Sequence, residues 1–124
     1  MSANRVALVT GATGFVGEHL VRSLLADGWV VHTIVRPSSD ATVLRDILGS
    51  SNVHVCHGNT RSLVEAMLGV RPDVVFHLAS TFVAEHTTDD VDPLVQSNIL
   101  FGTQLLEAMV VAGVSAIVNT GTTW

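Results

Sequence analysis

The chain has 124 residues, of which 48% are hydrophobic and 14% are charged, and its formal net charge is -5. This length suits one domain, residues 1–124, with a substantial core, and the composition excludes a disordered chain. We find no apolar stretch long enough to span a bilayer and no basic field that would attract nucleic acid or an anionic membrane. The start of the chain lacks the features of a secretion signal, and Cys56 is the single cysteine, so we expect a cytoplasmic protein without an internal disulfide.

Three elements are predicted in the first third of the chain. A continuous apolar run at residues 5–10 is typical of a strand buried on both faces of a parallel sheet. A helix follows from Gly14, with apolar residues at helical spacing up to Leu25 and with Gly28 as its C-terminal cap. The β-branched residues at 29–35 then predict a second strand.

The middle of the chain continues this alternation of strand and helix. We expect a helix at 43–48, capped by Ser38 or Ser39, and a third strand at 52–56.

The next helix is predicted to begin at Ser62, which stands at capping-box spacing from Glu65, and a fourth strand is expected at 73–78. The dipeptide Asp92-Pro93 then favours the start of a long helix, because Asp caps helices well and Pro suits the first helical position.

The long helix is expected to end at Gly113, before a fifth strand at 114–119. Its inward face is predicted to carry Leu94, Val95, Asn98, Leu105, Leu106, Met109 and Val110. Strict alternation predicts an α/β fold of the Rossmann type, a doubly wound parallel sheet in strand order 3-2-1-4-5 with helices on both faces. In such sheets the ligand binds at the carboxyl ends of the strands, where the order reverses.

Residues 10–17, Thr-Gly-Ala-Thr-Gly-Phe-Val-Gly, join the first strand to the first helix. The spacing of Gly11, Gly14 and Gly17 allows a tight turn, a close approach of pyrophosphate and close packing of the helix on the strand, with Thr13 in the same loop. The helix start adds free N–H groups and a favourable dipole for phosphates. We therefore predict a dinucleotide site; the alternative is a glycine-rich turn in another kind of α/β domain.

Arg36 follows the second predicted strand, and residues 35–37 contain no acid. At this position a carboxylate binds the ribose 2′-OH of NAD, whereas an arginine pairs with the 2′-phosphate of NADP. NADP is therefore favoured, with NAD as the second choice. The alternative is a solvated arginine at a strand end.

Further motifs accompany the glycine loop: Gly58-Asn59, His77-Leu78-Ala79-Ser80, and residues 98–108, Asn-Ile-Leu-Phe-Gly-Thr-Gln-Leu-Leu-Glu-Ala. Together they resemble the extended and atypical short-chain dehydrogenase/reductases, a family that includes sugar-nucleotide epimerases, dehydratases and reductases. The resemblance covers the whole chain and implies a dinucleotide cofactor.

The resemblance also implies further cofactor contacts. The family usually has Gly-Asp where this chain has Gly58-Asn59, and its carboxylate meets the adenine amino group; Asn59 retains an acceptor oxygen for that contact. The alternative for Asn59 is a turn residue before a helix. By the same resemblance the cofactor contacts Phe15, Val16, Thr60, Leu78, Ala79, Ser80 and Asn98. Of these, Leu78 and Val16 are equally compatible with a place in the core.

The family's chemistry uses a Ser or Thr after the fifth strand and then a Tyr-x-x-x-Lys motif. The resemblance places Thr120 in the hydroxyl position, with Thr122 as the alternative; a hydroxyl that only satisfies the strand end is the other interpretation. The chain contains no Tyr. We therefore expect the Tyr and Lys to lie outside it, and the chain to be the N-terminal part of a longer protein.

The leading hypothesis is the cofactor-binding part of an NAD(P)-dependent epimerase, dehydratase or reductase that acts by hydride transfer. A nucleotide-linked sugar is the expected substrate by family resemblance, and the family's frequent dimers make a homodimer possible. Two alternatives come from other classes: a non-catalytic NADP sensor, and a flavin- or nucleoside-binding module.

No metal site is predicted. His54 and His57 are three residues apart near a strand, so alternation sends them to opposite faces. Asp89, Asp90 and Asp92 lack the glycine and terminal glutamate of a calcium loop and are interpreted as helix-cap and surface acids.

Overall fold

A five-stranded parallel sheet in the order β3-β2-β1-β4-β5 forms the centre of the computed structural model, which describes residues 4–122. The predicted strand order and Rossmann-type fold are confirmed. The strands are β1 (Val6–Thr10), β2 (Val30–Val35), β3 (Val53–Val55), β4 (Val74–His77) and β5 (Ile117–Asn119).

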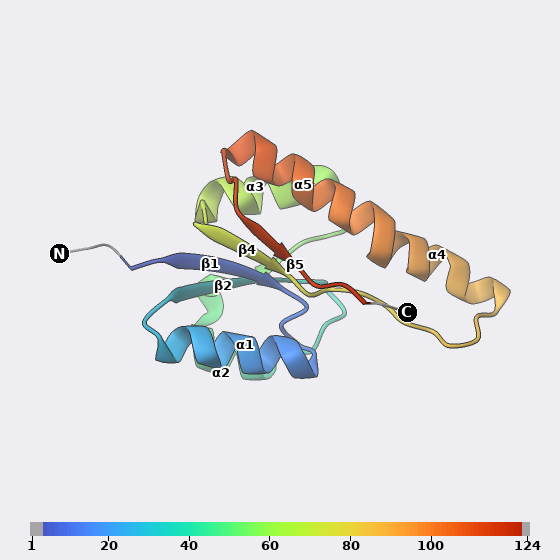
Figure 1. Cartoon of the computed structure of the whole chain (residues 1–124), viewed down its shortest axis with the longest axis horizontal. Helices are drawn as coiled ribbons and strands as arrows, with labels where there is room; N and C mark the ends of the chain where they lie inside the picture. The colour runs from blue at the N-terminus through green and yellow to red at the C-terminus, as the bar shows by residue number, and fades with distance from the viewer. Residues whose placement is uncertain (1–3, 123–124) are drawn as a thin grey trace.

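Helices cover both faces of the sheet (Figure 1). On one face lie α1 (Phe15–Ala26) and α2 (Thr42–Leu48), and on the other α3 (Thr60–Val70) and α5 (Phe101–Ala112). The central strand β1 sends Ala7 and Val9 to the core under α1 and α2, and Leu8 to the core under α3 and α5. Because residues 7–10 of β1 are completely buried, this strand fixes both layers.

The second helix begins differently from the prediction, because α2 starts at Thr42 with Ala41 as its N-cap. Asp40 Oδ1 accepts hydrogen bonds from Thr42 N at 3.2 Å and Thr42 Oγ1 at 2.8 Å. Ser39 instead accepts from the Arg36 N–H at 3.2 Å. The prediction of a cap at Ser38 or Ser39 is wrong, since the Ser39 hydroxyl closes the turn after β2.

Helix α3 begins at Thr60, two residues before the predicted start. Its N-cap is Asn59, whose Oδ1 accepts from Ser62 N at 2.8 Å, while the Ser62 hydroxyl donates to the Asn59 carbonyl at 3.0 Å. The predicted capping box of Ser62 and Glu65 is therefore wrong, because an Asn three residues ahead of Ser62 caps the helix first.

The long helix also starts earlier than predicted. Thr87 and Asp90 form a capping box at η2 (Thr88–Asp90), and α4 (Val91–Val95), the π-helical turn η3 (Gln96–Leu100) and α5 follow without a break. Asp92 and Pro93 thus lie inside the first turns rather than at the start.

The buried face of the long helix is only partly the predicted one. Leu105 and Met109 are buried as expected, but Leu106 is 53% exposed and Val110 is 76% exposed. Helix α5 buries Gln104, Leu105, Ala108, Met109 and Ala112, so its buried face lies one residue earlier than predicted. The prediction missed this because it assigned the larger apolar side chains to the core, whereas a polar Gln and two small Ala residues occupy those positions.

The continuous helix Thr88–Ala112 has 25 residues and contains an 18-residue stretch with a mean hydropathy of 1.3, so it is long and apolar enough to cross a membrane by length and composition alone. The expectation that no such stretch exists is therefore wrong. Its α5 part packs on the sheet through Leu105, Ala108 and Met109 in one core with α3. A single helix of this length and composition is weak evidence for a membrane segment.

Candidate functional site

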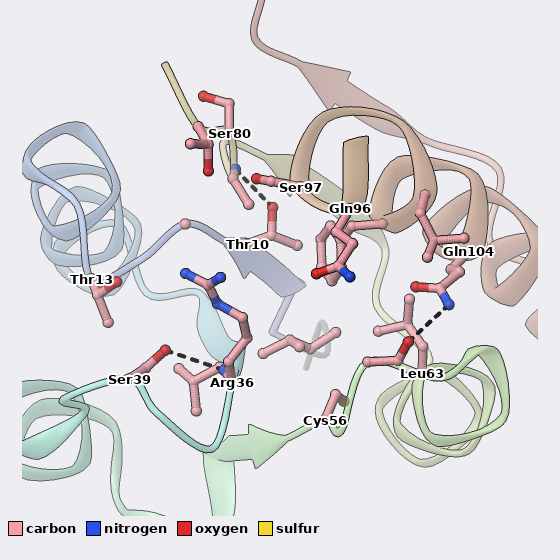
Figure 2. Close-up of a pocket in the computed structure, with 18 of the residues that line it drawn as sticks. Thr10, Thr13, Arg36, Ser39, Cys56, Leu63, Ser80, Gln96, Ser97 and Gln104 are labelled. Carbon is pink, nitrogen blue, oxygen red and sulfur yellow. Dashed lines mark hydrogen bonds between the residues drawn. The ribbon is translucent and has the colours of Figure 1, made fainter. Parts of the chain in front are cut away.

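A cavity of about 680 Å³ opens at the carboxyl ends of the strands, where the sheet order reverses between β1 and β4. Its walls come from the loops after β1, β2, β3 and β4 and from the long helix (Figure 2). The structure brings together in its lining Gly11, Thr13, Gly14, Arg36, Asn59, Leu78, Ala79 and Ser80. Outside that lining lie Phe15, Val16, Gly17, Thr60, Asn98 and Thr120. Contact of any of them with a ligand stays a prediction.

The glycines of the first loop have different surroundings. Gly11 has φ +71°, and a Cβ there would lie 2.7 Å from the Ala79 nitrogen. A Cβ on Gly17 would collide with the Gly11 carbonyl oxygen. A Cβ on Gly14 would meet only that same oxygen, at 3.3 Å. Gly11 and Gly17 therefore permit the packing of the fold, while Gly14 keeps the cavity wall free of a side chain.

Helix α1 directs its N-terminus at this loop. Its N-cap is Gly14, which has no side chain to cap the first turn, so the N–H groups there remain available to a ligand. Phe15 and Val16 are 80% and 63% exposed, and the Phe15 ring packs edge-on against His19. The alternative that Val16 belongs to the core is therefore wrong.

Thr10 links the end of β1 to the end of β4. Its buried hydroxyl oxygen accepts hydrogen bonds from Leu78 N and Ala79 N, both at 3.2 Å. With both lone pairs used, the hydroxyl donates its proton to His77 Nδ1, which lies 2.7 Å away. This fixes His77 as the tautomer protonated at Nε2, and burial lowers the pKa of this ring below its ordinary value.

Asn98 lies in the π-helical turn and holds the loop after β4. Its Oδ1 accepts from Thr81 N at 2.9 Å, and its Nδ2 donates to the Thr81 carbonyl at 2.8 Å. Asn98 therefore positions the segment that contains Ala79 and Ser80, which form part of the cavity wall. Sequence periodicity assigned it to the inward face of the helix, but its side chain bonds to this loop instead.

Arg36 extends its guanidinium into the cavity from the end of β2 (Figure 2). A tight turn holds its backbone, since Arg36 N donates to Ser39 Oγ at 3.2 Å and Ser39 N donates to the Arg36 carbonyl at 3.0 Å. Within residues 4–122, the one ion pair joins Arg22 and Glu18. The Arg36 charge thus faces the cavity without a carboxylate partner in that part of the chain.

Gln104, a residue of the motif at 98–108, forms part of the cavity wall. It lies on α5, is 8% exposed, lines the cavity and donates from Nε2 to the Gly58 carbonyl at 3.1 Å. The sequence offered little signal for it, because Thr103 and Glu107 are further polar residues of the same helix.

Thr120 lies just beyond β5 and is exposed. Both its N–H and its hydroxyl donate to the His77 carbonyl, at 3.2 and 3.1 Å. The hydroxyl thus satisfies the end of β4, as the alternative interpretation requires, and its catalytic role stays a prediction.

Two histidines on neighbouring strands form a pair that the sequence did not reveal. His32 Nδ1 and His54 Nε2 are 2.9 Å apart, and their rings stack with centroids separated by 5.2 Å. Burial lowers the pKa of both rings, and the neighbouring His54 adds to the effect on His32. In the described part of the chain, no three His, Cys, Asp or Glu side chains are grouped to hold a metal ion.

A glycine loop between the central parallel strand and a helix, at the switch point of a doubly wound sheet, defines the class of dinucleotide-binding α/β domains. Residues 7–124 match the model of the NAD dependent epimerase/dehydratase family, and the chain belongs to this family.

Two curated relatives show how widely the named activities vary. The chain is 34% identical over 116 residues to UDP-glucose 4-epimerase of Mycolicibacterium smegmatis, a match that covers 91% of this chain and 37% of the relative. It is 35% identical over 113 residues to sterol demethylase protein B of Methylococcus capsulatus, with coverages of 91% and 33%. The chain therefore spans about a third of the length of the relatives it matches.

Among solved structures, UDP-glucose 4-epimerase of Thermus thermophilus in complex with NAD superimposes with a TM-score of 0.75 at 27% identity. The match covers 90% of this chain and 36% of that one. It agrees with the strand order and with the Rossmann-type fold described above.

Replacing Gly17 by Ala should destabilise the fold by about 1–3 kcal/mol or more, because the new methyl group meets the backbone of Gly11. The matched control is Gly69→Ala inside α3, where a Cβ meets nothing within 4 Å. Better helix propensity should make that variant more stable by roughly 0.5–1 kcal/mol. Urea unfolding measures both; equal stability of the two variants would contradict the assigned packing.

Acidification should destabilise the protein through three half-buried histidines. The pKa values of His32, His54 and His77 are lowered from 6.5, so the unfolded chain takes up protons first as the pH falls. The stability that these rings contribute is complete above pH 6.5 and is lost as the pH falls through their folded pKa values. Urea midpoints at about pH 7.5 and about pH 5.5 measure the loss.

The variant His77→Asn removes one titrating group and should reduce that loss, because the Asn oxygen still accepts a hydrogen bond. A midpoint that does not change between the two pH values would show that the rings do not control stability.

Proposed function

We propose that this chain forms the NADP-binding part of an enzyme of its family that acts by hydride transfer, with NAD as a weaker alternative cofactor. The observation that carries the proposal is the convergence of two groups on one cavity. These are the uncapped N-terminus of α1 behind Gly14 and the Arg36 guanidinium at the end of β2.

The pyrophosphate is assigned to the loop of residues 11–14 and the first turn of α1. Backbone N–H groups and the helix dipole favour a doubly charged group there, and Gly14 has no side chain to keep it at a distance. The neighbouring Arg36 then has the right place and charge for the 2′-phosphate of the adenosine ribose. The family is described as NAD dependent, so the preference for NADP rests on Arg36 alone.

The nicotinamide half is assigned to the ends of β4 and β5. We propose that the cofactor passes Ala79, Ser80 and the loop held by Asn98, and that Thr120 orients a substrate oxygen. When bound, the cofactor supplies the hydride chemistry, while the chain supplies position and electrostatics.

A nucleotide-linked sugar is the proposed substrate. The named activity of the Mycolicibacterium smegmatis relative supports it, and the 35% identity to a sterol demethylase protein makes a lipid-like alcohol the alternative outcome. A homodimer and a cytoplasmic location are proposed as well. The first is supported by exposed apolar side chains on the long helix, such as Val95, Ile99 and Val110, and the second by the buried free thiol of Cys56.

Replacing Gly14 by Val should abolish dinucleotide binding, with at least a hundredfold loss of affinity as a rough expectation, because the side chain fills the phosphate position. The fold should tolerate it, since Gly14 has an extended backbone with φ -78° and a Cβ meets only one oxygen at 3.3 Å. Fluorescence titration with NADPH measures the affinity, and the urea midpoint checks folding. A folded variant with unchanged affinity would refute the assigned loop.

Replacing Arg36 by Asp should weaken NADPH binding by roughly ten- to a hundredfold and leave NADH binding equal or stronger, because the carboxylate repels the 2′-phosphate but suits the 2′-OH. The control is Arg45→Asp, which makes the same change of charge on α2, outside the cavity lining. Titration of each variant with both dinucleotides gives the preference. If both variants lose the same amount of NADPH affinity, the loss comes from the changed net charge of the protein and not from a contact between Arg36 and the 2′-phosphate.

A further inference from the structure

The cavity continues past Arg36 to an apolar slot at the end of β3. Its walls include Ile34, Cys56 and Leu63, which are 6%, 6% and 1% exposed, and Phe101 from the long helix. A slot of this kind suits the flat ring of a nucleobase. If the pyrophosphate lies over β1 and the ribose beside Arg36, the adenine base falls here, since β3 is the next strand outward.

One side-chain amide in this region has a fixed orientation. Gln104 donates from Nε2 to the Gly58 carbonyl at 3.1 Å, and this bond decides which end of the amide is nitrogen, because an oxygen there would face another oxygen. The Gln104 Oε1 then points to the interior of the cavity, on the side of Gln96 (Figure 2). The cavity therefore holds a preorganised hydrogen-bond acceptor.

Asn59, the residue expected to bind the adenine amino group, has its acceptor in use. Its Oδ1 caps α3 by accepting from Ser62 N at 2.8 Å. The oxygen has a second lone pair, but the cap fixes the orientation of the amide, so turning it toward a base would break the cap and lower the stability of α3. Gln104 requires no such exchange.

We propose that Gln104 Oε1 accepts the hydrogen bond from the exocyclic amino group of adenine and thereby selects adenine over hypoxanthine. Hypoxanthine has a carbonyl oxygen in place of this amino group, so it would set two acceptors against each other. The inference rests on the proposed dinucleotide function and names the residue that recognises the base.

The test compares NADPH with its hypoxanthine analogue, which has a carbonyl oxygen in place of the amino group and a proton on the adjacent N1, by fluorescence titration of the 124-residue chain. The wild-type chain should bind NADPH about tenfold more tightly than the analogue, because the analogue replaces one hydrogen bond by a buried acceptor without a donor. Gln104→Met keeps the length of the side chain but removes the acceptor, and should bring this ratio to about one. Asn59→Ser retains a helix-capping oxygen and should leave the ratio unchanged.

The outcomes separate the inference from the function on which it rests. A wild-type ratio of about one overturns the inference without any variant, so it stays testable if Gln104→Met fails to fold. If the two cofactors bind equally well to Asn59→Ser but Gln104→Met still prefers NADPH, then Asn59 and not Gln104 contacts the base. If Gln104→Met binds both cofactors more weakly by the same factor, then Gln104 only holds Gly58 in place and does not distinguish the bases. Failure of the wild-type chain to bind either cofactor would instead refute the proposed function.

Discussion

The carboxyl ends of β1 and β4 are held together by the backbone of Gly11 and the hydroxyl of Thr10. Gly11 lies so close to the neighbouring strand end that a Cβ would come within 2.7 Å of the Ala79 nitrogen. Thr10 bonds to two successive N–H groups and one imidazole at the end of β4. These contacts determine where the loops on either side diverge, and the cavity lies at that point.

The three glycines of the loop after β1 serve two different needs, the packing of the fold and the space for a ligand. Gly11 and Gly17 are needed because backbone lies where a side chain would be, whereas a Cβ on Gly14 meets a single protein atom within 4 Å. The glycine motif therefore reflects both a packing constraint, at Gly11 and Gly17, and an open cavity wall, at Gly14. Substitutions at Gly17 act through packing, and those at Gly14 act through the space offered to a ligand.

The sequence was sufficient to predict the features that depend on local chain order. Alternating strands and helices led to the strand order, and the glycine spacing located the cavity. It was insufficient where tertiary contacts decide. Asn59 caps α3 in place of the predicted Ser62, and α5 buries the polar Gln104 while it leaves Val110 exposed. The tether from Gln104 to Gly58 joins residues 46 positions apart, which no local pattern encodes.

The two halves of the cavity differ in what this chain contributes. Over β2 and β3, the groups offered to a ligand are side chains with free functional atoms, the Arg36 guanidinium and the Gln104 oxygen. Over β4 and β5, Asn98 and Thr120 use their side chains to bond to neighbouring backbone. Asn98 and Thr120 therefore act through the backbone segments that they hold, whereas Arg36 and Gln104 are placed to contact a ligand directly.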